Sequence, residues 1–523
     1  MELYSLRFFT FLILSLLAYY LAGFIRPKAQ WCVLLCASLI SYLIVNAHSM
    51  IFILSTALTV WAGAMWLSSL SRRRDLAEKS AVDRAGRKAV REHYARKRRL
   101  VFLLVLAVNL GILCYIKYWN VILGHLRIHH GLSSLLLPLG ISFYTFQSLG
   151  YLIDIYYDKY ECERNPFRFL LFVSYFPQLI QGPINRFNNI QKDLFSAHKP
   201  DTEMFRLALL YMGYGYLKKC AIADMMSPMI AGIFDKPDPN VPGAAVLFGI
   251  LSYSVQQYCD FSGGIDIVLG VSMLFGIRMT PNFRQPYFSV SLADFWRRWH
   301  ITLGTWMRDY VFYPFAVTRP MQNLGKYAKK HFGRHAARTL PACIANLLVF
   351  FLVGLWHGAE THYLLWGIYN GLVIAASDLF KPAFQKLNGL LHIREESRGM
   401  YIFRIIRTFV IVNIGWFFDR ITDFSYCRTC FLNVFRHFDL AGAKDFIYAV
   451  GNDGWVFAYR LAAACLVFVF IISVLKERKI KVEEGILHLA LPLRWLLYVC
   501  VIAAVLWSFT VVGIARGFMY ANF

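Results

Sequence analysis

Two histidines stand in apolar or aromatic surroundings, where an imidazole is costly to bury. His357 ends a long apolar run and lies in Trp356-His357-Gly358, while His300 closes the segment Phe295-Trp-Arg-Arg-Trp-His300. A neutral imidazole near pH 7 can take a proton from an attacking hydroxyl and return it to a leaving group. Ionisable residues at membrane depth are functional candidates by default. Both histidines are therefore candidates for acyl transfer, with His357 the leading one and a structural core histidine as the alternative.

Metal and redox chemistry have weaker support in the sequence. His357, Glu360 and His362 follow an H-x-x-E-x-H spacing, which is not H-E-x-x-H, and one helix would not aim all three side chains inward. Cys427 and Cys430 have C-x-x-C spacing without a second pair, which favours a structural or incidental role. We expect no metal site and no bound cofactor. The chain also lacks a G-x-S-x-G elbow and a P-loop, so serine catalysis and ATP hydrolysis have no support.

The elements that must position these residues are membrane helices. Of 523 residues, 58% are hydrophobic and 17% aromatic, and only 16% are charged, against roughly 25% in soluble domains. Apolar runs recur at the length of roughly 20 residues that crosses a hydrocarbon layer of about 30 Å. The composition predicts an all-α polytopic membrane protein with one membrane domain over residues 1–523. We expect about 11–13 membrane segments, some of them re-entrant.

Two stretches are not typical of lipid-facing spans. The stretch 168–182 contains Pro177, and Pro183 follows it, which predicts a broken or re-entrant helix. The region 277–317 interleaves arginines with tryptophans and tyrosines, and a lipid-facing span cannot carry so many guanidinium groups. We expect short amphipathic or re-entrant helices there, at the cytoplasmic face. An interfacial belt of aromatic and basic anchors is the alternative.

The formal charge of +24 comes mainly from the gaps between apolar segments. The segment from Arg72 to Arg99 contains twelve Lys or Arg residues but only four Asp or Glu residues, and such basic loops are typically cytoplasmic. We therefore expect no nucleic-acid partner. With basic loops inside, the helix over 341–357 rises outward and places His357 in the outer half of the membrane. An acceptor outside could then reach His357, whereas a donor made inside would have to come through the protein.

Several polar residues near the two histidines are candidates for supporting roles. Gln257, Asp260 and Ser262 interrupt a long apolar run, so they line a channel or make hydrogen bonds between helices, which are common in membranes. In the region 277–317 and beside the histidine at 357, the remaining candidates support the re-entrant helices or contact a donor: Arg297, Arg298, Asp309 and Trp356.

An ordered set of motifs resembles a known family. It comprises Leu137-Pro-Leu-Gly-Ile-Ser-Phe-Tyr-Thr-Phe146, Phe176-Pro177-Gln178 with Gly182-Pro183, Tyr258-Cys-Asp-Phe-Ser-Gly263, Pro281-Asn-Phe283 with Pro286-Tyr287, Phe295-Trp-Arg-Arg-Trp-His300, Trp306-Met-Arg-Asp-Tyr310 and Gly354-Leu-Trp-His-Gly-Ala359. The chain resembles bacterial membrane-bound O-acyltransferases (MBOAT) of the alginate O-acetyltransferase type. The resemblance is strongest over residues 1–420, and residues 421–523 form extra C-terminal helices.

The resemblance implies a many-helix bundle around a central funnel, in which the histidine matching His357 is essential. It implies that His300 occupies a place where eukaryotic relatives often carry Asn or Asp. The segment Gly415-Trp-Phe-Phe-Asp-Arg420 departs from the family pattern because Asp419 precedes the arginine.

The sequence thus predicts an enzyme of the bacterial inner membrane that moves an acyl group, expected to be acetyl, to a hydroxyl of an exported polysaccharide. His357 is the expected general base, and His300 orients or relays. The donor is unknown, with acetyl-CoA and an acyl carrier as the candidates. Expected partners are membrane lipid, the polysaccharide acceptor and a periplasmic or extracellular acyltransferase. The alternatives are D-alanyl transfer to teichoic acid and a polysaccharide transporter without catalysis, since broken-helix bundles also form transport paths.

Overall fold

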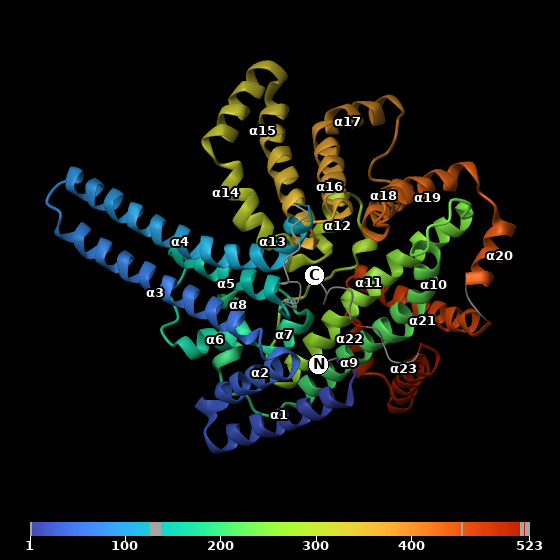
Figure 1. Ribbon diagram of the computed structural model, residues 1–523, viewed down its shortest axis with the longest axis horizontal. Coiled ribbons are helices and arrows are strands. Elements are labelled where there is room, and N and C mark those ends of the chain that lie inside the picture. Colours follow the sequence, from blue (N-terminus) through green and yellow to red (C-terminus); the bar gives the residue numbers. More distant parts are fainter. Residues whose placement is uncertain (1–2, 126–137, 451–452, 513–516, 518–523) are drawn as a thin grey trace. The chain divides into compact units, whose positions relative to one another are not determined.

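The computed structural model describes residues 3–125, 138–450, 453–512 and 517 (Figure 1). These residues form helices joined by turns and loops, with no strand within the described ranges. They fall into two compact units: unit 1 holds Met1–Ala208 and Val271–Thr280, and unit 2 holds Leu209–Gly270 and Pro281–Ala521. The predicted all-α fold is confirmed, whereas the single domain over 1–523 stays a prediction.

Unit 1 is built from the N-terminal helices. They are α1 (Leu6–Ile25), η1 (Pro27–Ala29), α2 (Gln30–Asn46), α3 (Met50–Ser80), α4 (Arg84–His125), α5 (Ile141–Tyr156), α6 (Pro166–Ser174), α7 (Phe176–Gln181) and α8 (Phe187–Phe195). Helix α5 is the centre of this unit, because every residue from Ile141 to Ile155 is buried. A helix enclosed on all sides needs no polar face, and α5 packs against α3, α4 and α6.

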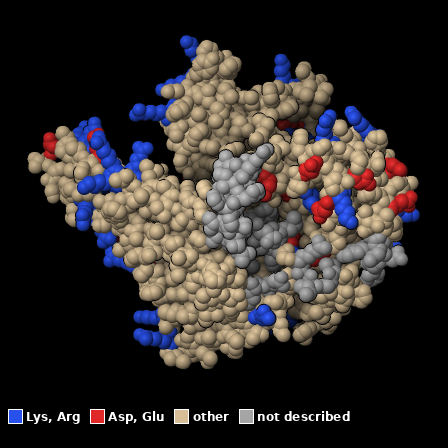
Figure 2. Space-filling view, in the orientation of Figure 1, with Lys and Arg blue, Asp and Glu red and all other residues tan. Residues whose placement is uncertain are grey.

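The longest helices of unit 1 are α3 and α4, which run side by side as a hairpin (Figure 1). Helix α3 is apolar as far as Leu70 and then continues through Arg72, Arg73 and Arg74 to Ser80. Its 31 residues span about 46 Å, which exceeds a hydrocarbon layer of about 30 Å. In Figure 2 Lys and Arg side chains gather over the connected ends of the two helices. The basic gap at 72–99 is therefore a helical extension of both spans.

Unit 2 contains the later helices. They are η2 (Leu217–Asp224), α10 (Met225–Phe234), η3 (Pro286–Phe288), α12 (Leu292–Arg298), α13 (Ile301–Met307), η4 (Arg308–Phe312), α14 (Tyr313–Ala316), α15 (Arg319–His357), α16 (Thr361–Leu379), α17 (Lys381–Leu390), α18 (Arg398–Arg420), α19 (Phe424–Arg436), α20 (Leu440–Val450), α21 (Asp453–Glu477), α22 (Val482–Leu487) and α23 (Leu491–Val512). Helices α9 (Thr202–Tyr216) and α11 (Gly243–Leu274) contribute residues to both units.

Eight of the described helices are long and apolar enough to cross a membrane, or nine if the bent pair α16 and α17 forms one span. The protein is therefore a multi-pass membrane protein. The sequence predicted about 11–13 segments by including broken and buried stretches, which do not meet this length and hydropathy test. The predicted stretch 134–157 lies partly outside the described residues, and its described helix begins at Ile141.

The two unusual stretches are broken as predicted. The stretch 168–182 divides at Tyr175 into α6 and α7, with Pro177 in the first turn of α7, where its missing N–H costs nothing. Between residues 286 and 316 the chain forms only the short segments η3, α12, α13, η4 and α14. The helix expected over 341–357 begins earlier, because regular geometry resumes after a break at Gly333, whose φ is 86°.

Candidate functional site

His357 is the last residue of α15 and lies at the closed end of a helical hairpin with α16. The two helices are packed closely: a Cβ on Gly354 would lie 2.6 Å from the carbonyl oxygen of Tyr363. A Cβ on Gly367 would lie 2.4 Å from the carbonyl oxygen of Phe350. Glycines at a helix contact allow such backbone approach in membranes. The hairpin therefore fixes the end of α15, and with it the position of His357, which is 6% exposed.

Aromatic rings surround the imidazole of His357. Its centroid lies 4.9 Å from the ring of Trp356 and 5.0 Å from the ring of Trp366, both near-perpendicular to it. The ring of Tyr363 stacks at 5.8 Å with an interplanar angle of 27°. Aromatic rings therefore enclose His357 on several sides and hold its imidazole in place.

His300 occupies the turn between α12 and α13. Helix α12 begins after Ser291, whose hydroxyl accepts a hydrogen bond from the N–H of Asp294 at 3.1 Å. His300 itself has a left-handed backbone, with φ 45° and ψ 54°. Its ring lies 4.9 Å from that of Phe261 in an edge-to-face contact and 6.2 Å from that of Trp356. Burial lowers the pKa of His300 to about 3, so this imidazole is neutral at physiological pH.

A cavity of about 860 Å³ in unit 2 is lined by both histidines. We call it the two-histidine cavity. Its remaining lining combines aromatic and aliphatic side chains from α12, α13 and α15 with polar groups, namely Arg284, Gln285, Arg297, Thr305, Arg308, Asn346, Asp378, Lys476 and Glu483. A space of several hundred cubic ångströms is the usual size of a small-molecule site. The structure thus brings together two residues that are 57 positions apart in the sequence.

Comparisons with known proteins match this region. Residues 163–418 match the family described as MBOAT, membrane-bound O-acyltransferase. The chain is 36% identical over 327 residues to the probable alginate O-acetylase of Pseudomonas syringae pv. tomato, covering 60% of this chain and 56% of that relative. It is 29% identical over 353 residues to the peptidoglycan O-acetyltransferase of Helicobacter pylori, covering 62% of each. It is 30% identical over 310 residues to the teichoic acid D-alanyltransferase of Bacillus subtilis, covering 58% of this chain and 73% of that relative.

The chain belongs to the MBOAT family. The resemblance inferred from the ordered motifs is therefore confirmed. The matched range 163–418 contains both histidines and ends before the helices from α19 onward. The chain spans little more than half of the length of the alginate O-acetylases that it matches.

The arginines predicted as support in this MBOAT protein have separate positions. Arg297 lines the two-histidine cavity with a side chain that is 68% exposed. Arg298 is not among the residues that line the cavity, and it forms ion pairs with Asp294 at 3.1 Å and with Glu477 at 2.8 Å. It therefore fastens α12 to α21.

Two further predicted residues flank the cavity lining. Asp309 forms an ion pair at 2.9 Å with Arg308, which is itself a lining residue. Trp356 contacts both histidines edge to face, with its ring 6.2 Å from that of His300 and 4.9 Å from that of His357. These contacts are consistent with positioning roles, which stay predictions.

The polar residues of α11 have partners on other segments of the MBOAT fold. Gln257 donates a hydrogen bond to Asp419 at 2.8 Å, and Ser262 accepts one from Lys218 at 2.8 Å. Asp260 lies 2.5 Å from Lys219. None of the three is among the residues that line the two-histidine cavity. Of the two alternatives left open by the sequence, hydrogen bonding between helices is the one that these contacts support.

The partners of these residues were not among the predicted candidates. Lys218 and Lys219 are 2% and 1% exposed, and Lys219 also lies 2.8 Å from Asp224. The signal was present, because two adjacent lysines interrupt an apolar stretch at 204–222, and buried lysines in membrane segments need partners. A sequence alone does not say which acids supply them.

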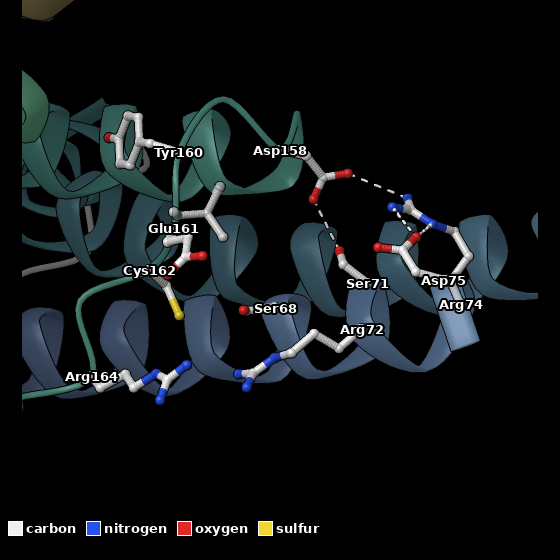
Figure 3. A pocket seen from close by; sticks show the side chains of 11 residues that line it. Ser68, Ser71, Arg72, Arg74, Asp75, Asp158, Tyr160, Glu161, Cys162 and Arg164 are labelled. Atoms are coloured by element: carbon white, nitrogen blue, oxygen red, sulfur yellow. Dashed lines mark hydrogen bonds and ion pairs between the residues drawn. The ribbon is translucent and has the colours of Figure 1, made fainter. Parts of the chain in front are cut away.

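Unit 1 carries a smaller pocket of about 310 Å³, lined from the end of α3 and the loop that follows α5 (Figure 3). Arg74 pairs there with Asp75 at 2.9 Å and with Asp158 at 3.3 Å, and Ser71 donates a hydrogen bond to Asp158 at 3.0 Å. No histidine is among the residues that line it, and all but one precede the range that matches the MBOAT family. This pocket shares no lining residue with the two-histidine cavity.

Proposed function

We propose that this protein is an acyltransferase that moves an acetyl group from a thioester donor to a hydroxyl of an exported polysaccharide. The observation that carries the proposal is that His300 and His357, both buried, line one cavity in an MBOAT chain. Relatives named alginate O-acetylase and peptidoglycan O-acetyltransferase support both the acetyl group and the polysaccharide.

The chemistry requires one proton to be moved twice. The acceptor hydroxyl oxygen attacks the carbonyl carbon of the thioester while its proton passes to a ring nitrogen of His357. The tetrahedral intermediate then collapses, the C–S bond breaks, and His357 returns the proton to the sulfur. The products are the ester and the free thiol, and the imidazole is neutral again. The apolar rings around His357 exclude water, which strengthens electrostatic stabilisation of the developing oxyanion.

The lining of the cavity favours a donor with negative charge. Four cationic side chains, Arg284, Arg297, Arg308 and Lys476, line it against two acidic ones, Asp378 and Glu483. Both candidate donors, acetyl-CoA and an acyl carrier, present their thioester on an arm that bears phosphate. Arginine and lysine are the side chains that bind phosphate best. We therefore assign these cations to donor binding.

The orientation of the chain follows from its charges. The basic connection of α3 and α4 and the basic start of α15 belong on the cytoplasmic side of the bacterial inner membrane. Single cysteines at Arg87 and Lys329 should then resist a membrane-impermeant thiol reagent in intact cells, whereas one at Lys444 should react. The opposite labelling would invert the orientation and place the acceptor in the cytoplasm. An external acyltransferase partner is compatible with the proposed orientation.

The proposal is tested by measuring ester groups on exported polysaccharide. The full chain is expressed in an alginate-producing strain that lacks its own O-acetylase, alongside His357→Ala as the inactive control. Acetyl ester on the polymer with the wild-type chain alone supports the proposal. In a second host that makes teichoic acid and lacks its own D-alanyltransferase, formation of D-alanyl ester on that polymer instead would favour the activity named for the Bacillus subtilis relative. Equal acetyl content with both chains would contradict catalysis and favour a transporter.

A further inference from the structure

We infer that Asn282 is a positioning residue for His300: its side-chain oxygen holds the ring in the neutral tautomer that carries hydrogen on Nδ1 and a lone pair on Nε2. The geometric part of this inference stands alone. Its catalytic consequence rests on the proposed function, in which His300 orients the acceptor or relays its proton.

One amide oxygen gathers three contacts. The Oδ1 atom of Asn282 lies 3.2 Å from Nδ1 of His300, 3.0 Å from the backbone nitrogen of Thr302 and 2.9 Å from the hydroxyl oxygen of Thr302. The backbone carbonyl of Asn282 also accepts a hydrogen bond from the N–H of Ile301 at 2.9 Å. Asn282 is 1% exposed, so water does not compete for these bonds.

The chemistry of the partners fixes which atom faces which. The backbone N–H of Thr302 can only donate, so the Asn282 atom opposite must be the oxygen and not the amide nitrogen. A ring nitrogen that faces the same oxygen at 3.2 Å must then carry a hydrogen. In a neutral imidazole only one nitrogen carries a hydrogen, so Nε2 of His300 has the lone pair. The tautomer is thus set by an obligatory backbone donor.

The same contacts stabilise an unusual backbone at His300. A left-handed conformation costs an L-residue roughly 1–2 kcal/mol and persists only where neighbouring structure holds it. Asn282 contacts three consecutive residues from 300 to 302, and the N–H of Arg284 donates to the carbonyl of Arg298 at 2.9 Å on the other side of the turn. Asn282 therefore fixes the direction of the ring as well as its protonation.

The consequence for catalysis concerns the lone pair at Nε2. A nitrogen with a lone pair accepts a hydrogen bond from a hydroxyl, which is what an orienting or relaying histidine must do. A ring rotated by half a turn, or the other tautomer, would present a hydrogen instead and repel the hydroxyl proton. Loss of Asn282 should therefore reduce turnover through His300, although Asn282 touches neither substrate.

The first test compares Asn282→Leu with Asn282→Asp in the acetyl-ester assay. The leucine variant removes the acceptor and should lower activity by about 10–100-fold, the size of effect known for partners that orient metal-binding histidines. The aspartate variant keeps an acceptor of the same shape and should retain activity. Its carboxylate should also raise the pKa of His300. The activity of this variant should therefore fall more than that of the wild type as the pH is lowered. The other titratable groups of the lining, His357, Asp378, Lys476 and Glu483, are the same residues in both proteins.

A double-mutant cycle separates positioning from folding. In the His300→Gly background, which removes the ring but tolerates the left-handed turn, Asn282→Leu should cost less than about twofold more, because the two residues act as one unit. Thr302→Val is the matched control, since it removes one hydroxyl from the same oxygen and keeps the backbone donor. The inference would be overturned if Asn282→Leu lowered activity by the same factor in the wild-type and His300→Gly backgrounds. Equal activity of the Asn282→Asp and Asn282→Leu variants would also overturn it.

A measurement independent of activity tests the geometry directly. In protein labelled with ¹⁵N-histidine and reconstituted in lipid, the His300 signals, assigned by their loss in His300→Gly, should report a neutral ring protonated at Nδ1. In Asn282→Leu that signature should change. A wild-type ring protonated at Nε2 would overturn the inference whatever the activity. If the tautomer is as inferred but no acyl transfer is detected in the wild type, the proposed function fails and the role of Asn282 in the turn stands.

Discussion

Unit 2 buries polar side chains in two different ways, around His300 and around Lys219. His300 is neutral, is held by an amide oxygen and by aromatic rings, and lines a cavity. Lys219 lies 2.8 Å from Asp224 and 2.5 Å from Asp260, and none of these three residues lines that cavity. All four side chains are at most about 5% exposed. The two sites differ in charge. The ion-paired groups of the lysine cluster stay charged, whereas the neutral imidazole of His300 can exchange a proton.

The lysine cluster joins η2 to α11. Lys218, next to Lys219, lies 2.6 Å from Asp266 and over the rings of Tyr214 and Tyr258. Isolated charges at this depth would be expensive, so each lysine is stable only with its acids in place. This arrangement holds two segments in register, while the imidazole cluster leaves room for a substrate. We therefore expect substitutions in the lysine cluster to reduce stability and substitutions in the imidazole cluster to reduce activity.

The largest expected effect is on activity, from His357→Ala. Loss of a general base typically costs about 10²–10⁴-fold, because alanine cannot take the proton from the acceptor hydroxyl. The variant should insert and purify as a monodisperse species, since the hairpin of α15 and α16 is held by backbone packing. Acetyl ester on polysaccharide and size-exclusion profile in detergent measure the two properties. Near-wild-type transfer would remove His357 from the mechanism.

Lys219→Met should destabilise the protein by about 3–5 kcal/mol, because it removes the cation that both Asp224 and Asp260 contact and leaves their charges buried. Thermal unfolding of the purified protein measures the loss. Lys481→Met is the matched control, because Lys481 pairs with Glu484 on the surface, where the two side chains are 75% and 61% exposed. A surface pair of this kind contributes little. Equal unfolding midpoints for the two variants would contradict the distinction between the clusters.

Replacing His300 should reduce activity less than replacing His357, by about 10–100-fold for His300→Ala, if the ring orients and does not itself act as the base. His300→Asn should retain more activity than the alanine variant, because an amide can also accept a hydrogen bond. His300→Gly is the backbone control, since glycine accepts the left-handed turn without strain. Initial rates of acetyl transfer by the three variants decide the matter, and equal rates for Asn and Ala would argue against an orienting role.

The smallest expected effect is on the pH dependence of stability. The pKa of His300 is lowered to about 3 in the fold, against about 6.5 in the unfolded chain. The unfolded state therefore binds more protons between these values, so the contribution is complete above pH 6.5 and is lost as the pH falls toward 3. Between pH 8 and pH 5 it amounts to about 2 kcal/mol. Unfolding midpoints should fall less steeply with pH in His300→Asn than in the wild type, and parallel slopes would contradict this.

The sequence predicted the parts of the site that depend on residue type. Both histidines and the broken character of 277–317 could be read from unusual polar residues in apolar surroundings. The convergence of His300 and His357 on one cavity could not, because it depends on how η4 packs against α15 and how α12 packs against α16. The motif Pro281-Asn-Phe283 was recognised without the role of Asn282, since that role arises from a turn 18 residues away.

The fold also has features that the sequence predicted and features that it did not. Composition and run length predicted membrane helices correctly, but not where long helices continue past their apolar part, as α3 does beyond Leu70. The break at Gly333 within α15 was also missed, because a single glycine in a basic stretch is a weak signal. The partners of Asp260 and Ser262 are set by the packing of η2 on α11, which no local pattern specifies.

The left-handed turn at His300 limits which residues can replace it, before any chemistry is considered. Apart from glycine, the residues found most readily in that conformation are asparagine, aspartate and histidine itself. In a saturation library at position 300, a replacement residue would thus have to meet two requirements, one set by the backbone geometry and the other by the reaction. These residues are polar, and each can offer a hydrogen-bond acceptor, at the δ position in asparagine and aspartate and at Nε2 in histidine. The left-handed backbone at this position therefore restricts replacements, apart from glycine, to side chains that can accept a hydrogen bond.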